Sequence, residues 1–92
     1  MKKKIAILGS TGSIGKSLIN IVKENKNEFK IELLTANKDY KNLLKQAKKF
    51  KVKNLIITDK KSFNKLKILN QDFNIKIYND FNSLNKIFKK KN

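Results

Sequence analysis

Four short apolar runs alternate with four stretches of helical apolar spacing, and this alternation limits the fold more than any other feature of the chain. Short runs suit strands, whereas apolar residues that recur every three or four positions predict amphipathic helices. Strands that alternate with helices favour crossover units and a parallel sheet. We therefore predict an α/β fold, a Rossmann-like doubly wound parallel sheet of four β-α units, with helices on both faces and strand order 3-2-1-4. The runs lie near residues 4–8, 29–34, 55–57 and 75–78, and the helical stretches near 14–22, 40–50, 63–69 and 81–88.

The three glycines of the chain, at positions 9, 12 and 15, lie between the first predicted strand and the first predicted helix. A helix N-terminus at the end of a strand offers unpaired N–H groups and a partial positive charge to a phosphate. Glycine lets the backbone approach that phosphate, or lets a helix and a strand pack closely. The hydroxyl groups of Ser10, Thr11 and Ser13 add donors, so we predict that this stretch binds the diphosphate of a dinucleotide. A tight turn whose glycines serve geometry alone is the alternative.

The same stretch also looks like a P-loop. Gly15, Lys16 and Ser17 match the end of that motif, and the run ending at Asp59 looks like a strand with a magnesium-binding acid. A P-loop needs four residues between its glycines, but five separate Gly9 from Gly15, and the extra residue turns later N–H groups away from the phosphate. Asp59 has a simpler role as the N-cap of the next helix. A P-loop-like nucleotide-binding protein therefore stays as an alternative.

The charge of the chain suggests a second alternative, a basic module that binds nucleic acid. The net charge is +16, and all 23 basic residues are lysine. Clustered cations attract phosphate backbones, but base readout favours the arginine guanidinium, which is absent here. The lysines are also spread along the whole chain, which is typical of a solvated surface. We therefore expect no specific nucleic-acid partner.

The chain contains no Cys and no His. The commonest metal ligands and the usual acid/base group near neutral pH are thus missing, so most hydrolytic and metal chemistries lack their parts. The apolar run after the basic N-terminus ends at Gly9, too early for a signal peptide, and no run approaches the roughly 20 apolar residues of a membrane span. We expect a soluble, cytoplasmic protein without a membrane partner.

The end of the second predicted strand bears on which dinucleotide is bound. Enzymes that prefer NAD place an acid about 20 residues past the glycines, where it accepts the ribose hydroxyls. Here Asn37 and Lys38 come before the first acid, Asp39. Lys38 suits a 2′-phosphate, which favours NADP, and Asp39 suits the N-cap of the second predicted helix.

Residues 4–15, KIAILGSTGSIG, resemble the N-terminal signature of the 1-deoxy-D-xylulose 5-phosphate reductoisomerase family. Asn25, Phe29, the segment 36–39, Gln46-Ala47 and Phe50 also match the pattern of that family, so the resemblance covers essentially all 92 residues. It implies that Thr11, Gly12, Ser13 and Ile14 contact the NADPH diphosphate and that Asn37, Lys38 and Asp39 border the 2′-phosphate. Asp39 departs from the usual Asn of the family, and Asn37 from a frequent Gly. The candidate cofactor-binding residues are Gly9, Ser10, Thr11, Gly12, Ser13, Ile14, Gly15, Asn37, Lys38 and Asp39.

The resemblance also implies what this chain lacks. In that family an Asp and two Glu hold Mg or Mn beyond the cofactor-binding half, and the enzyme rearranges and reduces a phosphorylated sugar in non-mevalonate isoprenoid biosynthesis. No segment here matches those metal ligands. We expect residues 1–92 to be an incomplete N-terminal NADP-binding domain that lacks the catalytic and C-terminal domains, carries no catalytic or metal residue and is inert alone. The resemblance also allows a homodimer of the intact enzyme.

Overall fold

Each predicted run forms a strand and each predicted stretch forms a helix in the computed structural model, which describes residues 2–71 and 74–88. The last helical stretch is the shortest, because a 3-10 turn precedes a single helical turn. The elements are β1 (Lys3–Ile7), α1 (Ser13–Glu24), β2 (Phe29–Ala36), α2 (Tyr40–Phe50), β3 (Asn54–Ile57), α3 (Lys60–Leu69), β4 (Lys76–Tyr78), η1 (Phe81–Ser83) and α4 (Leu84–Ile87).

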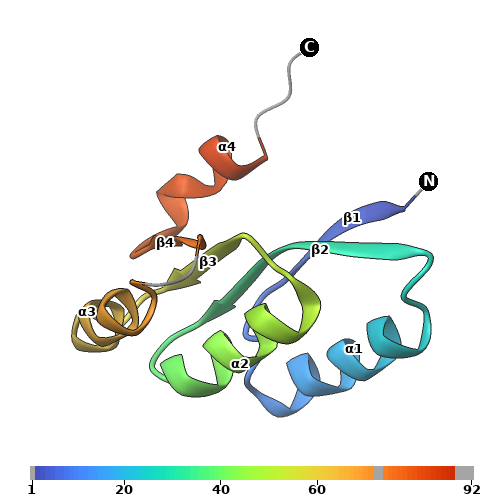
Figure 1. The fold of residues 1–92 in the computed structure, drawn as a ribbon, viewed down its shortest axis with the longest axis horizontal. Helices are drawn as coiled ribbons and strands as arrows, with labels where there is room; N and C mark the ends of the chain where they lie inside the picture. Colours follow the sequence, from blue (N-terminus) through green and yellow to red (C-terminus); the bar gives the residue numbers. More distant parts are fainter. Residues whose placement is uncertain (1, 72–73, 89–92) are drawn as a thin grey trace.

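All pairings in the four-stranded sheet are parallel, which confirms the predicted Rossmann-like sheet of β-α units. The predicted strand order 3-2-1-4 is wrong, because the observed order is β1-β2-β3-β4. Each connection therefore leads to the next strand in the same direction across the sheet. Because such crossovers are right-handed, the helices that connect the strands lie on the same face of the sheet. Figure 1 shows α1, α2 and α3 on one side of the sheet and the short α4 on the other. The reversal of direction that we expected beside the first strand does not occur among the described strands.

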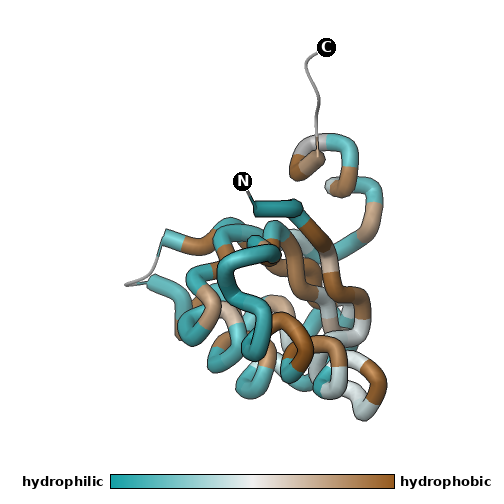
Figure 2. The backbone as a smooth tube through the Cα atoms, turned by 90° about the vertical axis from the view of Figure 1, so that its right-hand side faces the viewer, coloured by the Kyte–Doolittle hydropathy of each residue, from teal (hydrophilic) through white to brown (hydrophobic). Residues whose placement is uncertain are grey.

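The core lies between the sheet and the helices α1, α2 and α3. Its fully buried side chains come mainly from the two central strands and from α2 and α3. Figure 2 shows the hydrophobic segments running through the strands and recurring on the helices, with hydrophilic stretches between them. Burial of such side chains, about 1.5–3 kcal/mol each, holds β2 and β3 in place. The largest in the core cluster are Leu34, Leu43, Leu55, Ile57 and Leu66, and Leu33 and Ile56 are fully buried outside that cluster.

Helix α1 packs differently from the prediction. Ile14, Leu18, Ile21 and Val22 are spaced to make one face of a helix, but the first three are 79%, 42% and 51% exposed. The helix instead buries Gly15, Ile19 and Val22. Two of these exposed side chains, Leu18 and Ile21, line an open pocket of about 280 Å³ with residues of β1, an edge strand of the sheet.

The ends of the helices follow local side-chain chemistry. Asp39 and Asp59 are the N-caps of α2 and α3, as predicted, and each side chain accepts a hydrogen bond from a backbone N–H three residues later. At the C-terminal end of α2, Lys51 adopts φ 57°, a left-handed conformation that usually takes glycine.

Candidate dinucleotide-binding site

The glycine stretch joins the carboxyl end of β1 to the N-terminus of α1, as predicted. Gly9 has φ +66°, and a Cβ added to it would meet no atom within 4 Å. The left-handed backbone therefore explains this glycine, because any other residue would be strained there.

Gly15 is required for a different reason. A Cβ at Gly15 would overlap the carbonyl oxygen of Gly9 and would lie 2.6 Å from the Cα of Ser10. These atoms belong to the backbone, which cannot swing aside as a flexible side chain can. The missing side chain thus lets α1 pack directly on the loop that precedes it.

Neither of these two reasons for a glycine applies to Gly12. It is the N-cap of α1 with φ −81° and ψ 177°, an extended conformation open to any residue. A Cβ there would lie 3.5 Å from the Gly9 carbonyl oxygen, an ordinary contact. Neither the backbone conformation nor the packing requires a glycine at this exposed position, and the missing side chain leaves room for a ligand beside the helix N-terminus.

The N-terminus of α1 is open to an anion. The hydrogen bond from Lys16 N to Gly12 O (2.8 Å) begins the helical ladder, so the N–H groups of Ser13, Ile14 and Gly15 have no acceptor within the helix. The first turn contains no acid, and the N-cap makes no side-chain hydrogen bond. Ser13 and Ile14 are exposed, and Thr11 is half-buried beside them. A phosphate placed here would meet unpaired donors and the positive end of a helix dipole.

Ser10 lies beneath this surface and is fully buried. Its N–H donates to the carbonyl oxygen of Thr35 (2.9 Å), and its hydroxyl donates to Oε1 of Gln46 (2.7 Å). Its own carbonyl oxygen accepts from Nε2 of Gln46 (3.0 Å). The structure thus assigns every polar group of Ser10 to a protein partner, and its hydroxyl does not face solvent.

Thr35 and Gln46 were not predicted to contact the glycine stretch. Thr35 Oγ1 accepts the N–H of Gly9 (2.9 Å), so β2 holds both Gly9 and Ser10. Gln46 interrupts the apolar face of α2, three residues after Leu43 and four before Phe50. A polar side chain at such a position was the available signal that something polar lies opposite.

The loop after β2 lies at the same edge of the sheet as the glycine stretch, because Ile7 pairs with Leu34 at the ends of the two strands. Oδ1 of Asn37 accepts the hydroxyl of Thr58 (2.7 Å), which links this loop to the end of β3. Lys38 is exposed, and the carboxylate of Asp39 accepts both the N–H (3.3 Å) and the Nδ2 (2.8 Å) of Asn42.

Asp59 lies at the end of β3, next to this loop. Hydrogen bonds from the Ser62 hydroxyl and N–H lower the pKa of the Asp59 carboxyl below its ordinary value, and the charges of Lys38 and Lys61 lower it further. Its bonds to Ser62 mark it as the predicted cap of α3 rather than a magnesium ligand.

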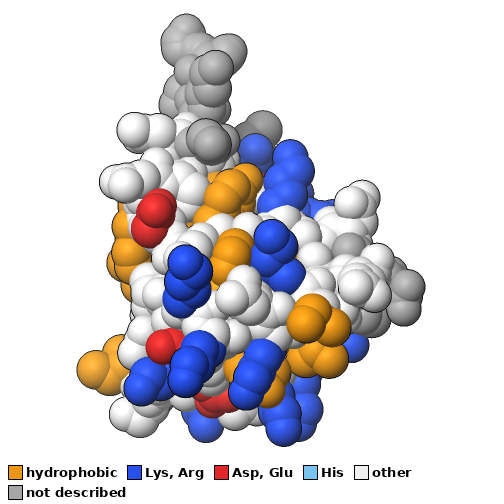
Figure 3. All heavy atoms as spheres, turned by 90° about the vertical axis from the view of Figure 1, so that its left-hand side faces the viewer, with side chains coloured by type: hydrophobic (Ala, Val, Ile, Leu, Met, Phe, Trp, Pro, Cys, Tyr) orange, Lys and Arg blue, Asp and Glu red, His pale blue; other side chains and the backbone are white. Residues whose placement is uncertain are grey.

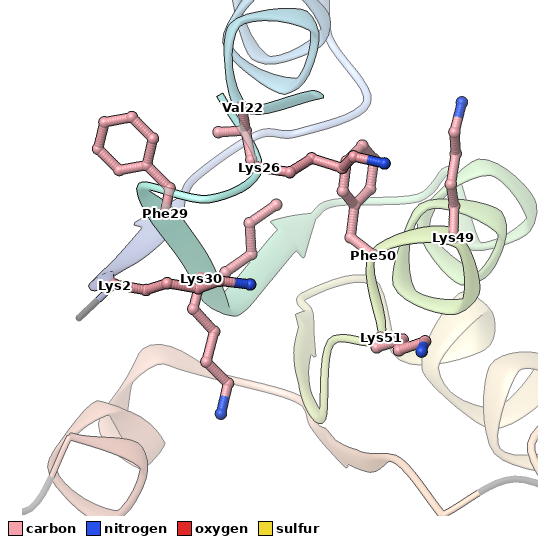
Figure 4. A pocket seen from close by; sticks show the side chains of 9 residues that line it. Lys2, Val22, Lys26, Phe29, Lys30, Lys49, Phe50 and Lys51 are labelled. Carbon is pink, nitrogen blue, oxygen red and sulfur yellow. The ribbon is translucent and has the colours of Figure 1, made fainter. Parts of the chain in front are cut away.

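Another cavity, of about 300 Å³, lies at the opposite ends of the strands and is bordered by lysines (Figure 4). Lys26 follows the C-terminal end of α1, and Lys49 and Lys51 flank that of α2. Cations favour helix C-termini, whose partial charge is negative, and this accounts for their placement without a ligand. On the face seen in Figure 3 the lysines lie scattered rather than gathered in one patch.

In the part of the chain that the structure describes, no three His, Cys, Asp or Glu side chains come together as a metal site would require. The described carboxylates therefore do not fit a metal ion, and we assign them no metal-dependent step. No helix among the described residues is long and apolar enough to cross a membrane.

A parallel β-α sheet whose first strand leads through a glycine loop into an open helix N-terminus defines a Rossmann-like dinucleotide-binding class of protein. Comparison with known sequences is more specific, because the model of the 1-deoxy-D-xylulose 5-phosphate reductoisomerase family matches residues 5–92. The chain belongs to this family. The match decides against the P-loop and nucleic-acid alternatives.

Named relatives agree with this assignment. The reductoisomerase of Pelagibacter ubique is 57% identical over 90 residues, which are 98% of this chain and 23% of that protein. The enzyme of Phocaeicola vulgatus is 37% identical over 87 residues and is covered to the same extent, 23%. The chain thus spans about a quarter of the length of these relatives.

Solved structures of the family share the fold. The reductoisomerase of Zymomonas mobilis in complex with NADPH superposes with a TM-score of 0.83 at 28% identity, over 95% of this chain and 23% of that one. A DOX-P reductoisomerase in complex with NADPH, fosmidomycin and magnesium gives a TM-score of 0.83 at 28% identity, over 92% and 21% of the two chains.

Proposed function

We propose that residues 1–92 bind NADPH as part of the cofactor-binding domain of a 1-deoxy-D-xylulose 5-phosphate reductoisomerase. The observation that carries this proposal is the open N-terminus of α1 behind a glycine that neither backbone nor packing requires. The similar structures that were solved with NADPH support it. When bound, NADPH supplies a hydride, and the residues of this chain bind and orient it.

The proposed roles differ along the glycine stretch. Thr11, Gly12, Ser13 and Ile14 border the diphosphate, where the free N–H groups of the helix meet its charge. Gly9 turns the loop, Gly15 brings α1 close to it, and Ser10 supports it from below.

A second segment, after β2, would select the phosphorylated adenosine. Lys38 is exposed at the correct edge of the sheet and offers a cation to the 2′-phosphate. Asn37 and Asp39 border the same position. The carboxylate of Asp39 is engaged as the cap of α2, and its negative charge opposes a nearby phosphate.

The cofactor-binding domain would be larger than this chain. The outer edge of β1 pairs with no strand among the described residues, and Leu18 and Ile21, which line a pocket with β1 residues, are 42% and 51% exposed. Such an edge beside apolar side chains suits further elements of the same sheet.

The complete reductoisomerase would convert 1-deoxy-D-xylulose 5-phosphate to 2-C-methyl-D-erythritol 4-phosphate by rearrangement and reduction. The phosphorylated sugar, a divalent Mg or Mn ion and the catalytic side chains would be bound by parts outside this chain. We propose that the complete enzyme is cytoplasmic and forms a homodimer. We expect the chain alone to have no catalytic activity.

The test is a fluorescence titration of the chain with NADPH, NADH and ATP. We expect NADPH to bind most tightly and Gly12→Ala to weaken NADPH binding at least tenfold while the chain stays folded. Tightest binding of ATP, or unchanged NADPH affinity in Gly12→Ala, would overturn the assignment of this loop. Ser17→Ala, a change on the exposed face of the same helix, is the matched control.

A further inference from the structure

The loop conformation depends on two side chains that are distant in the sequence. The carboxamide of Gln46 exchanges two hydrogen bonds with Ser10, one with its hydroxyl (2.7 Å) and one with its carbonyl oxygen (3.0 Å). Thr35 takes the N–H of Gly9 on its hydroxyl oxygen and the N–H of Ser10 on its carbonyl oxygen (both 2.9 Å). We call this set of four hydrogen bonds the loop clamp.

The chemistry of the clamp is specific. A primary amide presents one acceptor and one donor group in a single plane, and Ser10 presents the matching hydroxyl and carbonyl. Two bonds to one rigid group fix the orientation of the residue as well as its position. Because Ser10 is fully buried, losing Gln46 would leave its carbonyl oxygen without water to replace the lost bond, and would leave its hydroxyl with only the longer bond to the carbonyl oxygen of Thr35 (3.4 Å).

The clamp also decides where the loop donors point. The N–H groups of Gly9 and Ser10 both face β2, so they are occupied and unavailable to a ligand. The chain turns at Gly9, with φ +66°, and the N–H of Gly12 donates to the carbonyl oxygen of Gly9 (3.0 Å), whereas Ser13, Ile14 and Gly15 have N–H groups with no acceptor within the helix. A loop released from the clamp would be free to turn its N–H groups elsewhere.

We propose that Gln46 and Thr35 are positioning residues for the cofactor: they hold the glycine loop in its binding conformation before NADPH arrives, without touching it. This inference rests on the proposed function and deepens it. A protein whose binding-competent form is only partly populated has an apparent affinity reduced by that fraction. If loss of the clamp leaves about a tenth of the molecules competent, the Kd for NADPH rises about tenfold.

Two pairs of variants test the clamp. Gln46→Met keeps the length of the side chain and removes both hydrogen bonds, and Lys45→Met introduces the same residue at the neighbouring exposed position. Thr35→Val keeps the shape and removes the acceptor for Gly9, whereas Thr35→Ser keeps that acceptor. We expect Gln46→Met and Thr35→Val to raise the NADPH Kd about tenfold, and Lys45→Met and Thr35→Ser to stay within about twofold.

A second measurement follows the loop without ligand. The amide signals of Gly9 and Ser10 in proton–nitrogen NMR spectra should move, and exchange faster with deuterium, in Gln46→Met and Thr35→Val but not in the two controls. All comparisons are made at a temperature at which circular dichroism shows the variants folded. Should Gln46→Met fail to fold, the pair at Thr35 decides, because serine there restores the acceptor.

The outcomes separate the clamp from the proposed function. If the unmodified chain binds NADPH and the Kd is the same in Gln46→Met and Thr35→Val, the proposed role of the clamp is wrong and the proposed function stands. An unmodified chain whose Gly9 and Ser10 amides are protected but which binds no NADPH overturns the proposed function, and with it the role of the clamp toward this cofactor.

Discussion

Replacing Gly15 by alanine should lower the free energy of unfolding far more than the same change at Gly12. The added Cβ at Gly15 would overlap the carbonyl oxygen of Gly9 and would lie 2.6 Å from the Cα of Ser10, so α1 or the loop must move to restore ordinary contacts. Overpacking costs about 1–3 kcal/mol, and the upper value applies here because the opposing atoms are backbone. Alanine regains about 1 kcal/mol of helix propensity, which leaves a loss of about 2 kcal/mol.

Urea unfolding followed by far-ultraviolet circular dichroism measures this loss. A decrease of about 2 kcal/mol in the free energy of unfolding corresponds to a fall of about 8–16 °C in Tm for a domain of this size. The matched control is Gly12→Ala, for which the worse N-cap costs about 0.5 kcal/mol. If Gly15→Ala is no less stable than Gly12→Ala, close packing of α1 on the loop is not what requires that glycine.

Three further changes test other parts of the structure. Lys51→Gly should raise the free energy of unfolding by about 0.5–1 kcal/mol in urea titrations, because glycine adopts the left-handed conformation without strain; Lys53→Gly, outside that conformation, should not. Asp39→Asn keeps a side-chain cap and removes a charge near the proposed 2′-phosphate, so NADPH should bind about threefold tighter by fluorescence titration, and weaker binding would place the phosphate elsewhere. Folding lowers the pKa of Asp59, so the ionised carboxylate stabilises the folded chain. This stabilisation is present above the unfolded pKa, near pH 4, and is lost as the pH falls through the folded pKa. The urea midpoint of the unmodified chain should therefore drop below pH 4 more steeply than that of Asp59→Asn, and parallel curves would contradict the cap.

The elements could be predicted because their signals are local. The run at residues 4–8 corresponds to β1 at Lys3–Ile7, and the stretch at 40–50 coincides with α2 at Tyr40–Phe50. The acids that cap α2 and α3 were predictable for the same reason, since each bonds to a residue three positions later. The glycine stretch was correctly placed between a strand and a helix by its position between two such signals.

The order of the strands was not predictable in this way. Apolar spacing indicates that a strand is buried, but it does not say on which side of its predecessor the strand lies, and right-handed crossovers are compatible with either. The exposed stripe on α1 has a similar cause. Ile14 and Leu18 have helical spacing, yet the packing of Gly15 on the loop turns a different side of the helix toward the sheet.

The clamp was missed because it joins distant positions. Gln46 is separated from Ser10 by 36 residues, and only the folded chain brings its carboxamide to the loop. We predicted the Ser10 hydroxyl as a donor to the diphosphate, whereas it is buried and donates to Gln46 of α2.

The arrangement of strands in the sheet bears on how the chain reaches its fold. Each strand pairs with its immediate predecessor in the chain, so the sheet can grow in the order in which a ribosome synthesises it. Closing each β-α-β loop then spans only a few tens of residues, which keeps the entropic barrier to each step low. By this route β1 can pair as soon as β2 has been synthesised. The glycine loop can then form its hydrogen bonds to Thr35 before β3 has been synthesised.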